Sequence, residues 1–338
     1  MKKSRFILLV GLASIFYSCS SDMDKNIEQG SLRIRLGVNT NSYTRSAINS
    51  INDLVAHGNK VGIIAVETAN PNAANVVLTT DWTPSPLMSN VQTTSITTSG
   101  VIHWADDYNY PVEENRYVKF CAYYPYVQTG VNGNTDYAVL SNGNSPIVHF
   151  QIDGSKDLMI ANPVIGNRYT NPGNLVFRHL LTQLQFQLID AGGSFMNQSI
   201  TEIRFPDLNV HSTMNVETGA LGQWNNKLGN SLIYNQDQPG YYPRKIIHST
   251  ELNPQVLPGS IMLQPGLSKF DIILKIKDQS GTEREYPVEI VPISSGDTTF
   301  AAGKSYMISL YFVSLTTIRL TATVMPWEFG GTGEGILE

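Results

Sequence analysis

Residues 31–38 read Ser-Leu-Arg-Ile-Arg-Leu-Gly-Val and indicate the fold more clearly than any other stretch. Apolar and basic residues alternate there with a period of two, which is typical of a half-buried β-strand, because successive side chains of a strand point to opposite faces. Arg33 and Arg35 fall on one face of this strand. The other face carries Leu32, Ile34, Leu36 and Val38. The stretch therefore predicts a strand that lays one face on a core.

The same alternation recurs along the chain, between turns rich in Gly, Asn, Pro and Ser. These runs are rich in β-branched and aromatic residues, which fit a pleated, half-buried surface. We expect strands at 60–66, 101–104, 117–124, 147–152, 175–189, 270–277, 285–291, 306–313 and 318–325. No long segment has a period of 3.6 residues, although residues 46–56 could hold one or two helical turns. Many short strands between turns predict an all-β protein built of β-sandwiches.

The beginning of the chain has the pattern of an export signal. Residues 2–5 are cationic, residues 6–16 form an apolar run, and Cys19 follows small and apolar residues. This order is typical of a secretory signal that ends in a lipoprotein cleavage box. The apolar run is shorter than the roughly 20 residues of a permanent transmembrane helix, although a single uncleaved anchor is the alternative. We therefore expect a signal peptide at 1–18, lipidation of Cys19, and a flexible tether at 19–30.

Length and turn composition suggest two domains after the tether. The mature chain is long enough for two domains of about 100–200 residues each. A turn cluster, Asn-Arg-Tyr-Thr-Asn-Pro-Gly-Asn, occupies residues 167–174, about midway along the chain. We place an N-terminal β-sandwich domain at 31–172 and a C-terminal one at 173–338.

Charge and cysteine content narrow the class of protein. The whole chain has 23 basic and 28 acidic residues and a formal charge of −5. Loss of the signal peptide removes Lys2, Lys3 and Arg5 and no acidic residue, which leaves a formal charge of −8. Nucleic acid is therefore not an expected partner. Apart from Cys19 the chain has only Cys121, which we interpret as a small buried apolar side chain.

A polar loop follows the first predicted strand and carries a single basic residue, Arg45, before Ser46. Exposed loops of this composition are preferred sites of proteolytic cutting. A cut after Arg45 would release the first strand, and the groove left behind would have unpaired backbone groups that an extended strand from another subunit could fill. The plainer interpretation is that Arg45 is one solvated arginine in a loop.

Several motifs, taken in their order along the chain, resemble those of the fimbrillin family, the FimA-like and Mfa-like subunits of anaerobic Gram-negative bacteria. They are the box ending at Cys19 and the stretches at 44–47, 120–126, 157–161, 177–184 and 322–327. The resemblance runs over nearly the whole chain.

The resemblance implies two tandem transthyretin-like β-sandwich domains in a palmitate-bearing lipoprotein of the outer membrane. It also implies cleavage between Arg45 and Ser46 by an arginine-specific protease and assembly with other subunits into a fimbrium by strand exchange, with a role in cell adhesion. The strand lost on maturation would carry Leu32, Ile34, Leu36 and Val38. The donor region would be strand 318–325 with tail 326–338, although the glycine-rich stretch at 330–333 pairs poorly. Surface glycans or proteins of host or bacterial cells are further partners of such an adhesin.

No pattern in the sequence predicts catalysis, a metal site or a cofactor. The six histidines do not have metal-ligand spacing, and we expect His179 to be packed with a hydrogen-bonded ring. The acidic residues Asp106, Asp107, Glu113 and Glu114 have no EF-hand spacing. One alternative is a surface glycan-binding lipoprotein of a nutrient-uptake system, with Trp82, Trp104, Tyr108 and Tyr110 as a stacking platform. A glycosidase is a second alternative, but no carboxylate pair can be placed at a working separation.

Overall fold

The computed structural model describes residues 33–40, 60–68, 86–130, 135–140, 145–170, 172–227, 232–235, 238–292, 298–314 and 317–325. This described part of the chain forms 23 strands and no helix, so the protein is all-β, as predicted. It has no helix long and apolar enough to cross a membrane. The predictions for Cys19, Leu32, Arg45, Ser46, residues 46–56 and tail 326–338 lie outside the described residues.

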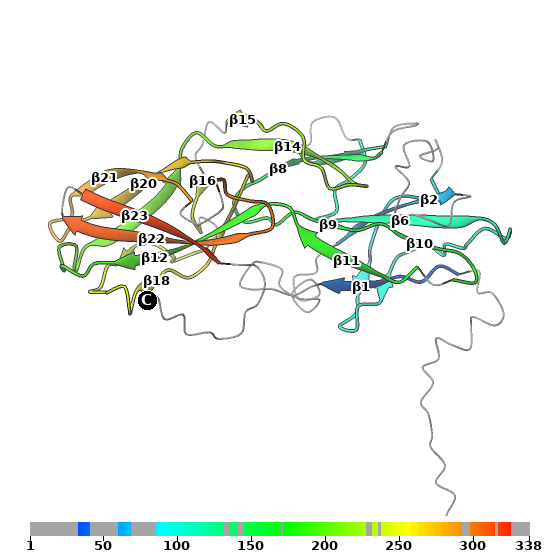
Figure 1. The fold of residues 1–338 in the computed structure, drawn as a ribbon, viewed down its shortest axis with the longest axis horizontal. Helices are drawn as coiled ribbons and strands as arrows, with labels where there is room; N and C mark the ends of the chain where they lie inside the picture. The colour runs from blue at the N-terminus through cyan, green and yellow to red at the C-terminus, as the bar shows by residue number, and fades with distance from the viewer. Residues whose placement is uncertain are drawn as a thin grey trace, which may run out of the picture.

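The largest sheet occupies one end of an elongated molecule (Figure 1). It consists of β1 (Gly37–Thr40), β2 (Gly62–Thr68), β3 (Met88–Gln92), β6 (Tyr117–Tyr124), β9 (Met159–Ala161), β10 (Val164–Gly166) and β11 (Asn174–His179). Its main order is β1-β11-β9-β6-β2-β3, with β10 also paired to β6. A separate small hairpin joins β4 (Ser95–Ile96) to β5 (Ile102–His103).

Two five-stranded sheets occupy the other end of the molecule (Figure 1). One contains β12 (Thr182–Ile189), β18 (Gln255–Val256), β19 (Ile261–Leu263), β22 (Ser305–Ser314) and β23 (Thr317–Met325). The other contains β13 (Ser199–Phe205), β16 (Leu232–Ile233), β17 (Arg244–Lys245), β20 (Phe270–Lys277) and β21 (Glu283–Ile290).

A four-stranded sheet lies along one long side of the molecule, where Figure 1 labels β8, β14 and β15. Its strands are β7 (Tyr137–Val139), β8 (Ile147–Gln151), β14 (Asn209–Asn215) and β15 (Asn225–Lys227), in the order β15-β14-β8-β7. The pairing of β8 with β14, like that of β9 with β11, crosses position 172. The division into domains at 31–172 and 173–338 remains a prediction, which these two pairings cross.

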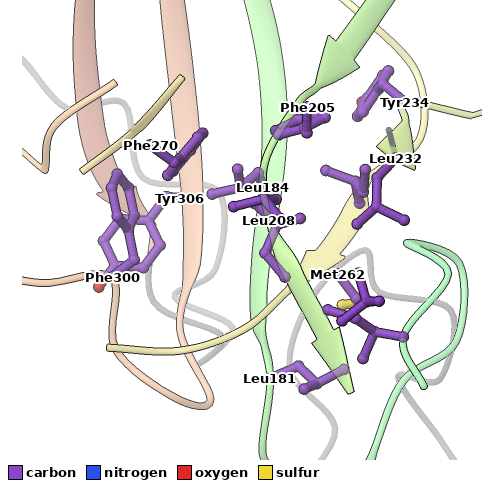
Figure 2. Packing of buried hydrophobic residues seen from close by; sticks show 14 of the residues in the cluster. Leu181, Leu184, Phe205, Leu208, Leu232, Tyr234, Met262, Phe270, Phe300 and Tyr306 are labelled. Atoms are coloured by element: carbon purple, nitrogen blue, oxygen red, sulfur yellow. The ribbon is translucent and has the colours of Figure 1, made fainter. Parts of the chain in front are cut away.

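Aromatic side chains fill the core between the two five-stranded sheets. Figure 2 shows Phe270, Phe300 and Tyr306 together, with Leu184 and Phe205 beside them. The ring centroids of Phe270 and Phe300 are 5.0 Å apart, and those of Phe300 and Tyr306 are 4.9 Å apart. Burying a large apolar side chain contributes about 1.5–3 kcal/mol, so this cluster stabilises the C-terminal half strongly.

The seven-stranded sheet is buried on both faces at its centre. Ile63 of β2 and Phe120 of β6 face one apolar cluster, whereas Ile64 and Cys121 face the larger cluster that continues into the rest of the molecule. A strand buried on both faces reads as a continuous apolar run, which explains the sequences of β2 and β6. Cys121 is the free, fully buried cysteine that the sequence predicts, and burial raises the pKa of its thiol to about 12.

A buried ion pair joins the seven-stranded sheet to the four-stranded sheet. The Nζ of Lys119 on β6 contacts the Glu217 carboxylate, and both side chains are almost completely buried. The Ser145 hydroxyl donates a second hydrogen bond to that carboxylate, 2.5 Å long. Glu217 reaches this position from a tight turn after β14, in which Asn215 Oδ1 accepts hydrogen bonds from the backbone N–H groups of Glu217 and Thr218. Because the turn closes at Gly219 with φ +74°, a side chain there would be strained.

The prediction of one continuous strand at 175–189 is wrong. The structure divides it into β11 in the seven-stranded sheet and β12 in a five-stranded sheet. At the break, Leu180 N–H donates to the Leu158 carbonyl and Gly303 N–H donates to the Leu181 carbonyl. Both leucines are buried, so the apolar pattern continues through the point where the chain changes sheets.

Candidate functional site: the segment at residues 33–40

Residues 33–40, which we call the leader segment, lie between two backbone walls. One wall is β11, which pairs in parallel with β1 from Gly37↔Asn174 to Thr40↔Phe177. The other wall is the stretch 100–109, which we call the opposite wall. It makes isolated antiparallel bridges to Arg33 and Gly37. The opposite wall therefore holds residues 33–38 and β11 holds residues 37–40, so the two walls flank the segment together at Gly37 and Val38.

Three backbone hydrogen bonds join the leader segment to the opposite wall. Ile34 N–H donates to the Tyr108 carbonyl at 2.8 Å, and Val38 N–H donates to the Gly100 carbonyl at 2.7 Å. In return, Ile102 N–H donates to the Leu36 carbonyl at 3.1 Å. The bonds at Leu36 and Val38 follow one antiparallel register, whereas the bond from Ile34 to Tyr108 lies outside it. β1 itself begins only at Gly37, later than the predicted strand.

The predicted inner face of the leader segment is confirmed for the described residues. Ile34, Leu36 and Val38 are only 2–3% exposed, and they belong to the same apolar cluster as Phe120 of β6 and Leu175 of β11. Arg33 and Arg35 are exposed, as the alternation predicts. The segment therefore completes the apolar cluster of the seven-stranded sheet.

The outer face of the leader segment is weakly attached. Arg33 forms an ion pair with Asp107, but the two side chains are 60% and 66% exposed. Exposed pairs of this kind contribute about 0–1 kcal/mol. An open hollow of about 350 Å³ lies beside the pair, and its lining includes Arg35, His103 and Trp104. The attachment of the segment therefore comes from its apolar face and its backbone.

The predicted donor region is only partly described. β23 pairs antiparallel with β22 from Ser305↔Met325 to Ser314↔Thr317, and it is the last strand in the order of its sheet. The predicted strand 318–325 agrees closely with β23. Tail 326–338 lies outside the described residues.

Residues considered for other chemistry have structural contacts. His179 Nδ1 lies 2.6 Å from the Asp157 carboxylate, so the expected packed and hydrogen-bonded ring is confirmed. Asp107 pairs with Arg33, and Glu114 accepts a hydrogen bond from the Tyr169 hydroxyl. Within the described residues, no group of three or more His, Cys, Asp or Glu side chains could hold a metal ion.

The proposed aromatic platform does not form as a whole. Tyr110 is 7% exposed and packs edge-on against Phe120, and burial raises the pKa of its hydroxyl. Trp104 and Tyr108 make an edge contact at 6.1 Å between ring centroids. Trp82 lies outside the described residues.

The sequence does not predict the two walls of the leader segment. Its pattern predicts a strand at 101–104, but alternation does not say which strands are neighbours. The parallel pairing of β1 with β11 joins residues far apart in the chain, and only the buried Leu175 and Phe177 give a sign of it. The alternation of the leader segment was the one local signal of the site.

Comparisons with known proteins agree with this architecture. A model of the fimbrillin-like family matches residues 44–327. No protein of curated function matches the sequence. Among solved structures, a fimbrial protein from Bacteroides vulgatus is similar with a TM-score of 0.58 and 15% identity, over 87% of this chain and 99% of that one.

Two further solved structures have the same fold. A proposed cell adhesion protein from Bacteroides uniformis has a TM-score of 0.53 and 18% identity, over 88% of this chain and 99% of that chain. One from Bacteroides ovatus has a TM-score of 0.53 and 16% identity, over 89% and 99%. The family match covers most of the chain, and the chain therefore belongs to the fimbrillin-like family.

Proposed function

We propose that this chain is the precursor of a structural fimbrial subunit or fimbria-associated adhesin with no enzymatic activity. It would be exported as a lipoprotein, attached to the outer face of the outer membrane through Cys19, and cut between Arg45 and Ser46 by an arginine-specific protease. Other fimbrial subunits would be its partners in the polymer. Membership of the fimbrillin-like family and likeness to a fimbrial protein and two proposed adhesion proteins support this role.

One observation carries the mechanism: the leader segment lies between two backbone walls and precedes Arg45 in the chain. A cut after Arg45 would free the segment from the rest of the protein. Its departure would leave the Tyr108 and Gly100 carbonyls and the Ile102 N–H without these partners. Water would reach these groups in the emptied groove, so a new strand would be favoured mainly because it covers the exposed apolar cluster again, with renewed backbone pairing adding to this.

Apolar contacts explain why a covalent cut would be needed first. Ile34, Leu36 and Val38 are each buried, and each contributes about 1.5–3 kcal/mol. A competing strand must displace all of them at once while the leader segment stays tethered at high effective concentration. After the cut, the segment can diffuse away, and an incoming strand with apolar residues at alternate positions can replace it.

The donor strand would come from the C-terminal end of another subunit. β23 is long and pairs with β22 over its length, so its release would break a full ladder. Its place at the end of its sheet means that only this ladder has to open. Strand exchange through β23, with tail 326–338, is the form of assembly we propose.

Limited proteolysis of the mature chain beginning after Cys19 tests this function. An arginine-specific protease should give a new N-terminus at Ser46, and light scattering should then show growth into oligomers that resist SDS. The Arg45→Ala variant is the control and should stay uncut at this site and monomeric. Absence of any cut after Arg45 in the native chain, or growth of the Arg45→Ala variant, would contradict the proposed maturation.

A further inference from the structure

The outer face of the four-stranded sheet carries a hollow of about 420 Å³ that the assembly mechanism does not use. Strand alternation places Val148 and Phe150 of β8 inward, so Ile147, His149 and Gln151 point outward. On β14 the outward residues include His211 and Thr213. The hollow therefore lies on the solvent side of a sheet whose other side packs on the core.

All four strands contribute to this hollow. Tyr137 of β7, His149 of β8 and Thr213 of β14 form one cross-strand row, because the register pairs Tyr137 with His149 and His149 with Thr213. His211 of β14 pairs with Asn225 of β15 in the next row. Thr135 completes the rim. Groups on paired strands are held more rigidly than groups on loops, so this arrangement is preorganised.

Two of the rings lie face to face. The ring centroids of Tyr137 and His149 are 4.2 Å apart and their planes differ by 7°. Partial burial lowers the pKa of His149 and so favours its neutral imidazole, which offers one hydrogen-bond donor and one acceptor. The hydroxyl of Thr213 and the amide of Asn225 add further donors and acceptors.

The chemistry of the lining favours a ligand with both apolar and hydrogen-bonding surfaces. The described residues that line the hollow include no Asp, Glu, Lys or Arg, so their side chains offer ring faces and hydrogen-bonding groups. The nearest carboxylate in sequence, Asp136, accepts a hydrogen bond from Gln151 N–H and lies 3.6 Å from Lys156 Nζ. Two imidazoles alone fall short of the ligands a transition metal needs.

A saccharide has the matching properties. A sugar ring has an apolar face that packs on aromatic rings and hydroxyl groups that both donate and accept hydrogen bonds. The volume of the hollow falls within the range of about 300–1,000 Å³ that is typical of small-molecule sites. We propose that the hollow on β7, β8, β14 and β15 binds a neutral saccharide, which packs on a ring face that the stacked Tyr137–His149 pair leaves free. His211, Thr213 and Asn225 would be its hydrogen-bonding groups.

This inference goes beyond the proposed function and does not depend on strand exchange. The test uses the uncut Arg45→Ala variant of the mature chain, so that a failure of maturation cannot affect it. The probe is an array of neutral oligosaccharides that end in galactose, glucose, mannose or N-acetylglucosamine, followed by titration calorimetry with the best binder. We expect Tyr137→Ala and His149→Ala each to weaken binding roughly tenfold, through lost stacking and hydrogen bonds.

Asn225→Arg provides a second variant that does not disturb the core, because Asn225 is exposed and the long side chain would fill the hollow. It should abolish binding while the thermal unfolding midpoint stays the same. Tyr169→Ala, which removes an exposed ring elsewhere, is the matched control and should bind as the parent does. The proposal is overturned if no neutral oligosaccharide binds, if binding survives in all three hollow variants, or if EDTA abolishes binding.

Discussion

The leader segment and β12 have similar alternating sequence patterns but differ in how extensively they pair with other strands. Both alternate apolar and polar residues, and both place their apolar side chains in a core. β12, however, pairs with β22 over seven register positions and with β18 and β19 on its other side, in the middle of the chain. The leader segment has a four-residue ladder and three further backbone bonds, and it lies close to the N-terminal end of the described chain.

This difference shows that a strand has two separate properties, its burial in the core and its ability to leave the fold. Sequence alternation alone does not distinguish them. Burial of apolar side chains decides whether a strand belongs to the fold. The extent of its pairing and its place in the chain decide whether it can leave and be replaced. β12 cannot leave without breaking its five-stranded sheet on both of its sides, whereas under the proposed maturation a single cut beyond the leader segment would free that segment.

Removing the central side chain of β12 should have the largest effect on the free energy of unfolding. Phe186 is fully buried, and its ring centroid lies 5.0 Å from that of Tyr234. We expect Phe186→Ala to lower the free energy of unfolding by about 3–5 kcal/mol, through lost apolar burial and the cavity that remains. Urea denaturation followed by fluorescence measures this change. Val256→Ala on neighbouring β18, where the side chain is 44% exposed, is the control and should change the free energy of unfolding little.

Breaking the buried ion pair should lower the free energy of unfolding by a similar or slightly smaller amount. Lys119→Met leaves the Glu217 carboxylate buried without its cation, and such a loss typically costs about 3–5 kcal/mol. The double variant Lys119→Met with Glu217→Leu removes both charges, so we expect it to recover much of that loss. If the single and the double variant unfold at the same urea concentration, the pair does not hold the two sheets together as described.

A cavity made in the leader segment should destabilise mainly that segment and the opposite wall. Leu36→Ala removes a buried side chain, and we expect a cost of about 2–3 kcal/mol at the lower end of the range for such changes. Hydrogen exchange should then be faster in residues 33–40 and in the opposite wall, with β12 still protected. Equal loss of protection in β12 would mean that the leader segment and the C-terminal half unfold as one unit.

Removing the exposed ion pair of the leader segment should have the smallest effect on the free energy of unfolding. Because Arg33 and Asp107 are both more than half exposed, Arg33→Ala should change the free energy of unfolding by less than about 1 kcal/mol. Urea denaturation at low and high salt measures the change. A cost comparable to that of Leu36→Ala would show that charge, and not apolar burial, holds the segment.

The sequence predicts elements well where one local pattern governs them. The strand at 270–277 agrees with β20, which alternation defines, and the strand at 117–124 agrees with β6, which a nearly continuous run of apolar and aromatic residues defines. It fails at 175–189, where buried Leu180 and Leu181 continue the pattern through a change of sheet. Short strands such as β9 and β10 were not predicted, since their three residues are too few to show a period.

The sequence predicts only one part of the candidate site, which is the buried face of the leader segment. The inward face of Ile34, Leu36 and Val38 follows from alternation, and the structure confirms it. The walls that receive this face depend on pairings between distant residues, such as Val38 with Leu175, and no local pattern encodes them. For the same reason no local pattern predicts the row of Tyr137, His149 and Thr213, which depends on the register of β7, β8 and β14.

Returning the leader segment to the cut protein would show whether these residues and a donor strand compete for the same groove. A synthetic peptide of residues 31–40 would be added to mature chain immediately after cleavage at Arg45, with a Leu36→Asp peptide as the matched control. We expect the native peptide to bind the cut chain and stop its growth into oligomers, whereas the control peptide should do neither. Growth at the same rate in the presence of either peptide would contradict the claim that these residues occupy the groove that a donor strand later fills.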